Sequence, residues 1–203
     1  MHRSEEQGDA TDLPPALPEA WVDGDLQPIE EGVGPLFHRL YRVRIREARL
    51  SPDEVIGSLR VDPNRAAPTE LARFLKARGA HGRFGVGEEL VVRMPGPWDG
   101  PVRVVETTTT SFRLATLAGH LEAGQIEFRA TQTDGMLCFE IESWARSGDR
   151  VSNLLYHHLR MAKEVQLHMW TSFLEQVCKL AGGRLTGGVE IISRKVEDPL
   201  ARS

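Results

Sequence analysis

The chain has 203 residues, a length typical of one domain with appendages, and 40% of them are hydrophobic, which is enough for a sizeable core. The formal net charge of −4 is unevenly distributed, because residues 1–40 hold nine acids against two bases. The rest of the chain is close to neutral, whereas nucleic-acid binding needs a clustered basic surface, so no nucleic-acid partner is expected. No apolar run is long enough for a transmembrane helix, so no membrane span is expected either.

The chain starts with MHRSEEQGDATDLPPALPEAW, which lacks the apolar segment of a signal peptide. Its two cysteines, Cys138 and Cys178, fall in a predicted strand and a predicted helix. Without an export signal, both are expected to be reduced thiols in a cytoplasmic protein. Neither lies in a pattern typical of a catalytic nucleophile, and no cofactor is expected.

The first 40 residues are rich in Pro, Gly and acids and lack sustained periodicity, so an acidic, partly disordered arm is expected there. The first strand is predicted at Tyr41–Arg49, where apolar residues alternate with Arg42, Arg44 and Arg46. Glu47 shares the parity of the apolar residues, which predicts that it points inward unless a bend near the strand end releases it to solvent.

Two short helices are expected after this strand. The sequence SPDE at 51–54 is typical of a capping box, which predicts a helix over about residues 52–60. A second helix is predicted over residues 68–79, because an apolar stripe recurs there at helical spacing. The stripe consists of Leu71, Phe74 and Leu75.

Five strands are then expected in close succession, joined by short links. Short links join antiparallel neighbours, and Asp-Gly at 134–135 is a strong hairpin signal, so the pattern predicts a meander. The predicted strands are Glu88–Met94, Val102–Thr108, Ser111–Ala118, Gly124–Gln132 and Met136–Ala145.

After Gly148-Asp149 the apolar period changes to 3.6 and holds to Gly182-Gly183, which predicts one amphipathic helix of about 32 residues. A short strand is expected at Val189–Ser193, within a C-terminal tail. An antiparallel sheet and one long amphipathic helix form a two-layer α+β fold, with the helix on the concave face of a curved sheet.

This order of elements resembles the helix-grip fold of the START-like superfamily, also called SRPBCC, over residues 41–182. The segment TLAGHLEAGQIEF at 116–128 resembles a motif of an uncharacterised bacterial and plant branch of that superfamily, a domain of unknown function. That branch usually has Pro where this chain has Leu121 and an acid where it has Gln125. The resemblance implies a helix-grip domain over residues 41–183, an arm before it and a tail over 184–203, and it implies no catalytic residue.

The same segment brings His120, Glu122 and Glu127 close together in sequence. A zinc deaminase site would also need P-C-x-x-C, which the chain lacks. Gly119 and Gly124 bracket a short connection between strands, so one interpretation is a hairpin whose polar residues cap backbone groups or face solvent. The other places His120 at the mouth of a pocket, since loops at sheet ends often border ligand sites.

Other charged residues favour structural roles. Cross-strand ion pairs are predicted between the first strand and the last strand of the meander, because these strands are neighbours in the proposed fold. The residues are Arg42, Arg44 and Arg46 of the first strand and Glu140 and Glu142 of the last. Glu164 and His168 have the i, i+4 spacing of metal ligands, but both fall on the polar face of the long helix. A solvated pair is therefore favoured, and no metal is expected.

Three polar residues interrupt the apolar face of the long helix, Gln166 near its centre and His158 and Gln176 near one edge. A buried amide costs roughly 1–3 kcal/mol unless it is hydrogen-bonded, so Gln166 requires a partner in the protein, a water or a ligand. An enzyme would require two titratable groups in contact inside the cavity, and only His158 with Glu47 could supply them.

We therefore predict non-catalytic binding of a small, largely apolar molecule, a lipid or metabolite, in a cavity between the sheet and the long helix. A cyclase- or hydrolase-like enzyme using the same cavity and a protein-interaction module with a filled core are the alternatives. The oligomeric state is left open. The predicted ligand-binding residues are Gln166, His158, Glu47, Trp170, Met169, Phe173, Phe139 and Phe128.

Overall fold

The computed structural model describes residues 1–77, 82–94, 99–148 and 156–197, with the side chains of 156–164 excepted. Its strands are β1 (His2–Gln7), β2 (Gly32–Arg46), β3 (Arg73–Lys76), β4 (Glu89–Arg93), β5 (Asp99–Thr107), β6 (Ser111–Thr116), β7 (Glu122–Thr133), β8 (Met136–Gly148) and β9 (Arg184–Val196). Its α-helices are α1 (Pro52–Val61) and α2 (Tyr156–Ala181), and its 3₁₀ helices are η1 (Ala10–Asp12), η2 (Glu19–Trp21), η3 (Ile29–Glu31) and η4 (Pro63–Arg65). Among these helices, none combines the length and hydrophobicity needed to cross a membrane.

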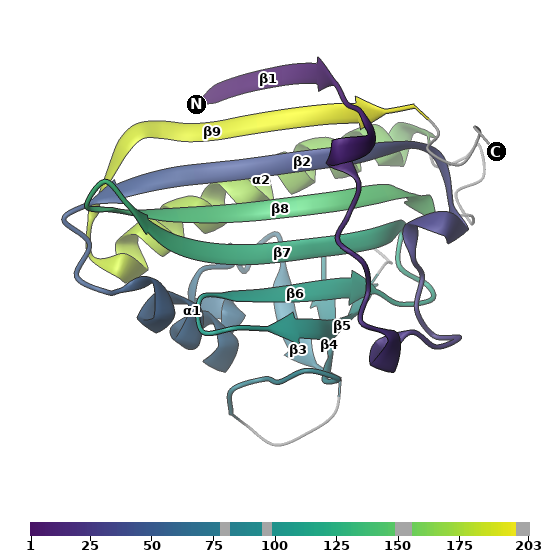
Figure 1. Ribbon diagram of the computed structural model, residues 1–203, viewed down its shortest axis with the longest axis horizontal. Coiled ribbons are helices and arrows are strands. Elements are labelled where there is room, and N and C mark those ends of the chain that lie inside the picture. The colour runs from purple at the N-terminus through teal and green to yellow at the C-terminus, as the bar shows by residue number, and fades with distance from the viewer. Residues whose placement is uncertain (78–81, 95–98, 149–155, 198–203) are drawn as a thin grey trace.

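The strands form one sheet in the order β1-β9-β2-β8-β7-β6-β5-β4-β3. Only the β1–β9 pairing is parallel among the described strands. Figure 1 shows α2 running along one face of the sheet and the N-terminal segment, residues 8–31 between β1 and β2, crossing the opposite face. We call these the inner and the outer face. The predicted α+β architecture, with a meander from β4 to β8 and a long C-terminal helix, is confirmed.

The main core lies between the inner face of the sheet and the two α-helices. Alternation along β2 buries Tyr41, Val43 and Ile45 against α2, as the period-2 pattern predicts. At the centre, the Phe128 ring lies 4.7 Å from that of Phe112 and 5.6 Å from that of Phe173, centroid to centroid. Aromatic side chains therefore fill the space beneath the C-terminal half of α2.

The first of the two predicted short helices is confirmed as α1. Its capping box forms as expected, because the backbone N–H of Ser51 donates to Glu54 Oε2 at 2.8 Å. Three apolar residues of this helix, Val55, Ile56 and Leu59, are fully buried. Their burial anchors α1 against β6 and β7 on the inner face.

The second predicted helix, over residues 68–79, is wrong in the described part of that range, where Arg73–Lys76 form strand β3. Phe74 pairs with Val92 of β4, and its backbone N–H and C=O are both bonded by the Asn64 side chain. Leu75 is consequently exposed instead of joining an apolar stripe. The pairing of β3 with β4 and the bonds from Asn64 to Phe74 stabilise the strand more than the helical spacing of the apolar residues would stabilise a helix.

Both ends of the chain contribute to the sheet. The first strand begins at Gly32, nine residues before the predicted start, and β9 is 13 residues long where a short strand over 189–193 was predicted. The two pair antiparallel, and β1 extends the sheet beyond β9. Helix α2 ends at Ala181, and Gly182 follows with φ +69°, as the paired glycines predict. The predicted start of the helix lies in residues 149–155, outside the described residues.

The N-terminal segment docks on the outer face through His38, which is 8% exposed. Its Nδ1 lies 2.7 Å from Asp12 Oδ1 and its Nε2 lies 2.8 Å from Glu142 Oε1. Ionised carboxylates only accept hydrogen bonds, so both ring nitrogens donate and the ring is an imidazolium. The ring also stacks on Trp144 at 5.3 Å.

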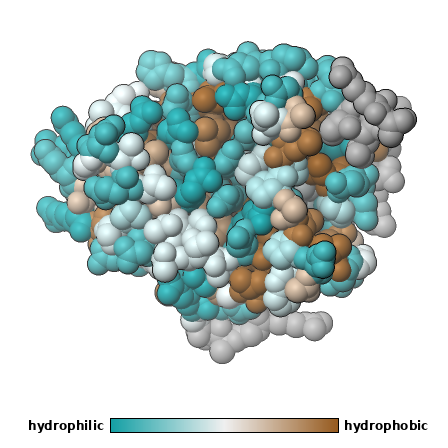
Figure 2. Space-filling model, viewed as in Figure 1, coloured by the Kyte–Doolittle hydropathy of each residue, from teal (hydrophilic) through white to brown (hydrophobic). Residues whose placement is uncertain are grey.

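Further ion pairs continue from this cluster across β2, β8 and β7. Glu140 accepts from Arg42 at 2.5 Å and from Arg129 at 2.7 Å. The Arg42 bond joins β2 to β8, which confirms the predicted ion pairing between the first predicted strand and the last strand of the meander. Glu142 pairs with His38 and Arg129, and not with an arginine of β2. In Figure 2, which views the outer face, hydrophilic residues dominate and hydrophobic ones gather on the half that the N-terminal segment crosses. The outer-face network consists of Asp12, His38, Arg42, Arg129, Glu140, Glu142 and Arg194.

Candidate functional site

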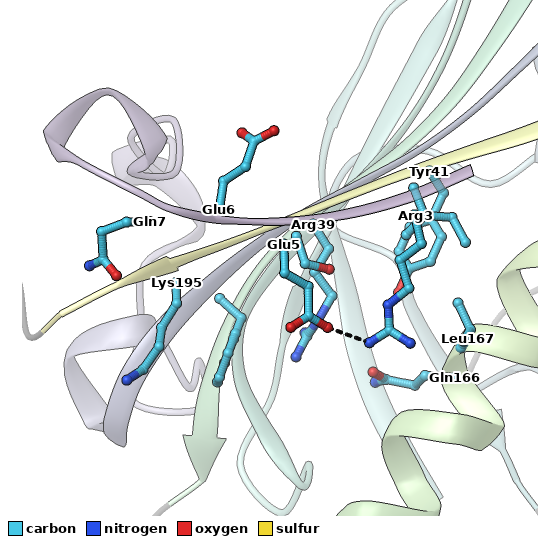
Figure 3. A pocket seen from close by; sticks show the side chains of 12 residues that line it. Arg3, Glu5, Glu6, Gln7, Arg39, Tyr41, Gln166, Leu167 and Lys195 are labelled. Carbon is cyan, nitrogen blue, oxygen red and sulfur yellow. Dashed lines mark hydrogen bonds and ion pairs between the residues drawn. The ribbon is translucent and has the colours of Figure 1, made fainter.

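A groove of about 500 Å³ opens on the inner face, between α2 and the three strands β1, β9 and β2. Figure 3 shows side chains from these strands pointing toward Gln166 and Leu167 of α2. The glutamate at position 6 lines its edge, but its carboxylate points to the other face, where it pairs with Arg194. The lining residues are Arg3, Glu5, Glu6, Gln7, Phe37, Arg39, Tyr41, Gln166, Leu167, Ile191, Ser193 and Lys195.

Arg39 brings an uncompensated charge to this groove. It precedes Tyr41 by two residues on β2, so both side chains emerge on the inner face. The guanidinium carbon lies 4.8 Å from the centroid of the Phe37 ring, which fixes its orientation by a cation–π contact. In the described part of the chain, Arg39 forms no ion pair and no hydrogen bond, although it is half-buried.

Tyr41 adds an unpaired hydroxyl beside Arg39. The residue is only 3% exposed, yet its hydroxyl has no hydrogen-bond partner among the described residues. Burial raises the pKa of the Tyr41 hydroxyl, so at physiological pH the group is a neutral donor. The hydroxyl of Ser193 on β9 likewise lacks a partner within the described ranges.

The other charges of the groove are compensated. Arg3 pairs with Glu5 at 2.7 Å, the contact dashed in Figure 3, and Lys195 pairs with Glu197 at 2.7 Å. Arg39 is thus the charged group of the described lining that has no oppositely charged partner among the described residues.

Gln166 finds its partner in the protein. Its Nε2 donates to Glu122 Oε2 at 2.8 Å, which joins α2 to the start of β7. Of the three kinds of partner left open by the sequence, the structure shows a carboxylate of the predicted hairpin. The amide also lines the groove, and a ligand-binding role for Gln166 stays a prediction.

The hairpin between β6 and β7 is a structural junction. The backbone N–H of Glu122 donates to His120 Nδ1 at 2.9 Å, and Gln27 Nε2 donates to the carbonyl oxygens of both residues at 2.9 Å. Burial lowers the pKa of His120, so the ring is neutral. Gly124 has φ +154°, and a Cβ there would meet the carbonyl oxygen of Trp144. The interpretation of this segment as a backbone-capping hairpin is confirmed, and His120 does not line the groove.

Five predicted ligand-binding residues lie in the core instead of the groove. All are at most 8% exposed, and the contacts among their rings leave them packed against one another. A ligand contact there would require this cluster to open, so the site proposed below does not include them. They are Phe128, Phe139, Met169, Trp170 and Phe173.

The predicted pair of His158 and Glu47 is not brought together. Glu47 has φ +56°, so the backbone leaves β2 and its carboxylate is exposed, 3.7 Å from Arg184. The bend that would release Glu47 to solvent is thus present, and its inward orientation is wrong. His158 lies in the first turn of α2, whereas Glu47 lies two residues before Arg49, whose backbone N–H donates to Ala181 at the other end of the helix, roughly 30 Å away along its axis. The side chain of His158 is outside the described residues.

No group of three or more metal-ligating side chains occurs in the part of the chain that the structure describes. His168 is exposed on α2, and the side chain of its predicted neighbour Glu164 lies outside the description. The arrangement at the groove suits binding of a polar group next to apolar surface, because it offers hydrogen-bond donors without a contacting acid–base pair.

Sequence reasoning missed Arg39, although a signal was present. Arg39 shares the strand parity of Tyr41, Val43 and Ile45, as Glu47 does, and an inward charge on an apolar parity is unusual. The strand was predicted to start at Tyr41, so the parity was not extended backward. The groove also depends on β9, of which only a short part was predicted, and on β1, which was not predicted.

Comparison with known proteins places the chain in a family and a fold. The model of a family described as a domain of unknown function (DUF1990) matches residues 68–176. No curated protein matches. The crystal structure of ginseng major latex-like protein 151 from Panax ginseng is 11% identical, with a TM-score of 0.52, over 71% of this chain and 97% of that chain.

Two further solved structures have lower scores. Ara h 8.0201 is 10% identical with a TM-score of 0.47, over 70% of this chain and 99% of that chain. A protein from Nitrosospira multiformis is 13% identical with a TM-score of 0.46, over 70% of this chain and 95% of that chain. The family match confirms the predicted resemblance to an uncharacterised domain of unknown function, and the ginseng structure supports the predicted fold alone.

Proposed function

The chain belongs to the family described as a domain of unknown function (DUF1990), and we propose that it is a non-catalytic module that holds a small molecule in the groove between α2 and strands β1, β9 and β2. Proteins of other sequence share this fold, so a function follows from the site and not from the fold.

The observation that carries this proposal is the lining of the groove. A volume of about 500 Å³ falls within the range of small-molecule sites, roughly 300–1,000 Å³. Apolar surface from Phe37, Leu167 and Ile191 lies next to polar groups that have no partner within the described chain. Ligand sites combine these two features, because apolar surface supplies affinity and a few polar groups fix orientation.

The enzyme alternative lacks support from the geometry. Its only predicted acid–base pair, Glu47 with His158, lies at opposite ends of α2. In the groove, the acid Glu5 is engaged with Arg3, and Glu122 accepts from Gln166. General acid–base chemistry needs a titratable group within hydrogen-bond reach of the substrate and in a suitable protonation state, and neither carboxylate is free for that role.

The proposed position differs from the cavity predicted by sequence. That cavity was predicted between the sheet and the long helix, and the aromatic residues predicted to line it pack on one another in the core. The groove lies further toward the N-terminal end of α2 and takes one wall from β9 and β1. The protein-interaction alternative assumed a filled core without such a site, so the groove favours the small-molecule proposal.

A groove-filling substitution tests the proposal. Ser193→Phe places a ring in the groove, whereas Ser4→Phe places the same ring on the opposite face of neighbouring β1. We expect the fluorescence of the neutral dye Nile red to rise on binding to wild type and Ser4→Phe, and to be lost with Ser193→Phe. Native mass spectrometry of the freshly purified proteins should show a co-purified small molecule in the same two. Equal dye binding by all three proteins would contradict the proposal.

A further inference from the structure

We infer that the ligand of the groove is an amphiphile with a single carboxylate head, of the fatty-acid kind, and that Arg39 holds this head with help from Tyr41 and Ser193. This inference rests on the proposed function, because it names the chemical class of the molecule that the groove holds. It draws on three features of the lining, namely charge, hydrogen-bond donors and apolar surface.

The charge of Arg39 would be compensated by a bound anion. A half-buried guanidinium has lost part of its hydration and usually regains the loss through a carboxylate or phosphate. On the outer face of the same strand, Arg42 lies 2.5 Å from Glu140. Arg39 has no such carboxylate among the described residues, where its guanidinium contacts the Phe37 ring and its N–H groups have no acceptor. The missing acceptor is what a ligand carboxylate provides.

The groups beside Arg39 are donors. The Tyr41 hydroxyl stays protonated because burial raises its pKa, and the Ser193 hydroxyl has no partner in the described chain. The nearby carboxylates are already engaged, Glu5 by Arg3 and Glu122 by Gln166. Donors that converge without a competing free carboxylate favour an anionic acceptor over a neutral or cationic head.

One free guanidinium matches one carboxylate. Its planar N–H groups fit two carboxylate oxygens in a bidentate pair, which satisfies a monoanion. A phosphate carries close to two negative charges, so its neutralisation would need a second cation besides Arg39. The other cations of the described lining are already paired, Arg3 with Glu5 and Lys195 with Glu197. The arrangement therefore favours a carboxylate over a phosphate head.

The apolar part of the ligand has surface to cover. Phe37 and Leu167 are half-buried at the groove, and Ile191 lies on its floor with 2% exposure. These residues come from β2, α2 and β9, so an alkyl chain would contact both walls of the groove. Burial of that chain supplies affinity that is independent of the head group.

The test uses isothermal titration calorimetry on the full-length, delipidated protein with four twelve-carbon probes below their micelle concentrations. The probes are dodecanoate, dodecyl phosphate, dodecanol and dodecyltrimethylammonium. The variants are Arg39→Met, which keeps the length without the charge, Arg39→Lys, which restores a charge, and the control Arg44→Met, an exposed arginine on the outer face of the same strand.

We expect wild type to bind dodecanoate about tenfold or more tightly than dodecanol and more tightly than the phosphate. Arg39→Met should bind the two almost equally, Arg39→Lys should recover part of the preference, and Arg44→Met should match wild type. Equal binding of dodecanoate and dodecanol by wild type, or a preference kept in Arg39→Met, would overturn the inference and leave the proposed function standing. Preference for the phosphate or the cation would overturn the carboxylate class. Binding of none of the probes would overturn both proposals.

Discussion

Strand β2 presents two very different faces, and residues 38 and 39 mark the difference. His38 on the outer face has a carboxylate at each ring nitrogen and a tryptophan ring against its plane. Arg39 on the inner face has a single ring contact and no ion pair in the described chain. The paired charges hold the N-terminal segment on the sheet. The charge of Arg39, which has no ion-pair partner in the described chain, lies instead at the groove proposed to bind a ligand.

The largest expected effect of a substitution falls on the paired face. His38→Ala leaves Asp12 and Glu142 buried without the imidazolium between them, although Arg194 and Arg129 still contact them. We expect a loss of about 2–4 kcal/mol in the free energy of unfolding, measured by urea denaturation. A loss below about 0.5 kcal/mol would show that the cluster does not hold the segment.

A smaller effect should appear in the pH dependence of stability. Burial alone would lower the pKa of His38, but the bonds to Glu142 and Asp12 outweigh burial and raise it. Burial raises the pKa values of Asp12 and Glu142, but other contacts outweigh it and lower both: the backbone N–H of Asp9, His38 and Arg194 for Asp12, and His38 and Arg129 for Glu142. The contribution of His38 is therefore complete below its ordinary pKa of about 6.5 and is lost as pH rises through the raised value. The contribution of the carboxyls is lost as pH falls through their lowered values.

The comparison of wild type with His38→Gln isolates this contribution. The contribution of His120 to stability depends on pH in the opposite direction. Burial lowers the pKa of His120 and folding keeps its ring neutral, so stability falls as pH drops below the ordinary pKa of histidine. The difference in unfolding free energy between the two proteins should be largest between about pH 5 and 6 and should shrink in alkaline solution. A difference that grows with rising pH would contradict the assignment of an imidazolium.

A still smaller effect is expected where the hairpin meets α2. Gln166→Leu removes the donor to Glu122 Oε2 and should lower the unfolding free energy by about 1 kcal/mol. Gln166→Glu, measured below pH 4, should restore part of the loss because a protonated carboxyl can donate. If Gln166→Leu raised stability, the contact would have no structural value.

The smallest effect on stability should come from the unpaired face. Arg39→Met removes a charge that has no partner in the described chain, so the unfolding free energy should change by less than about 0.5 kcal/mol. The matched substitution Arg42→Met breaks the contact with Glu140 and should cost more. Equal losses for the two variants would erase the contrast between the faces.

Much of the fold follows from local pattern. Alternation along β2, the Asp-Gly hairpin between β7 and β8, the capping box of α1 and the long amphipathic helix all appear in the structure. Strand β3 was missed because its conformation depends on pairing with β4 and on Asn64, which are tertiary contacts. Strand β1 was not predicted and β9 was predicted too short for the same reason, since β9 gains order from pairing with β2 and β1 from pairing with β9.

The site was less accessible to sequence reasoning than the fold. Gln166 was identified because a polar residue on an apolar face needs a partner, and the partner proved to be Glu122. The aromatic residues predicted to surround a cavity pack on one another, and periodicity cannot separate a filled core from a hollow one. Arg39 was missed because the strand was predicted to start at Tyr41, and its lack of an ion pair among the described residues could be recognised only in the structure.

A crystal structure with bound dodecanoate tests the central claim most directly. The account predicts electron density for an alkyl chain between α2 and β9, with the carboxylate within hydrogen-bond distance of Arg39 and the Tyr41 hydroxyl, and an unchanged aromatic cluster. Density inserted between Phe128 and Phe173 would contradict it, as would a groove that stays empty while calorimetry shows binding.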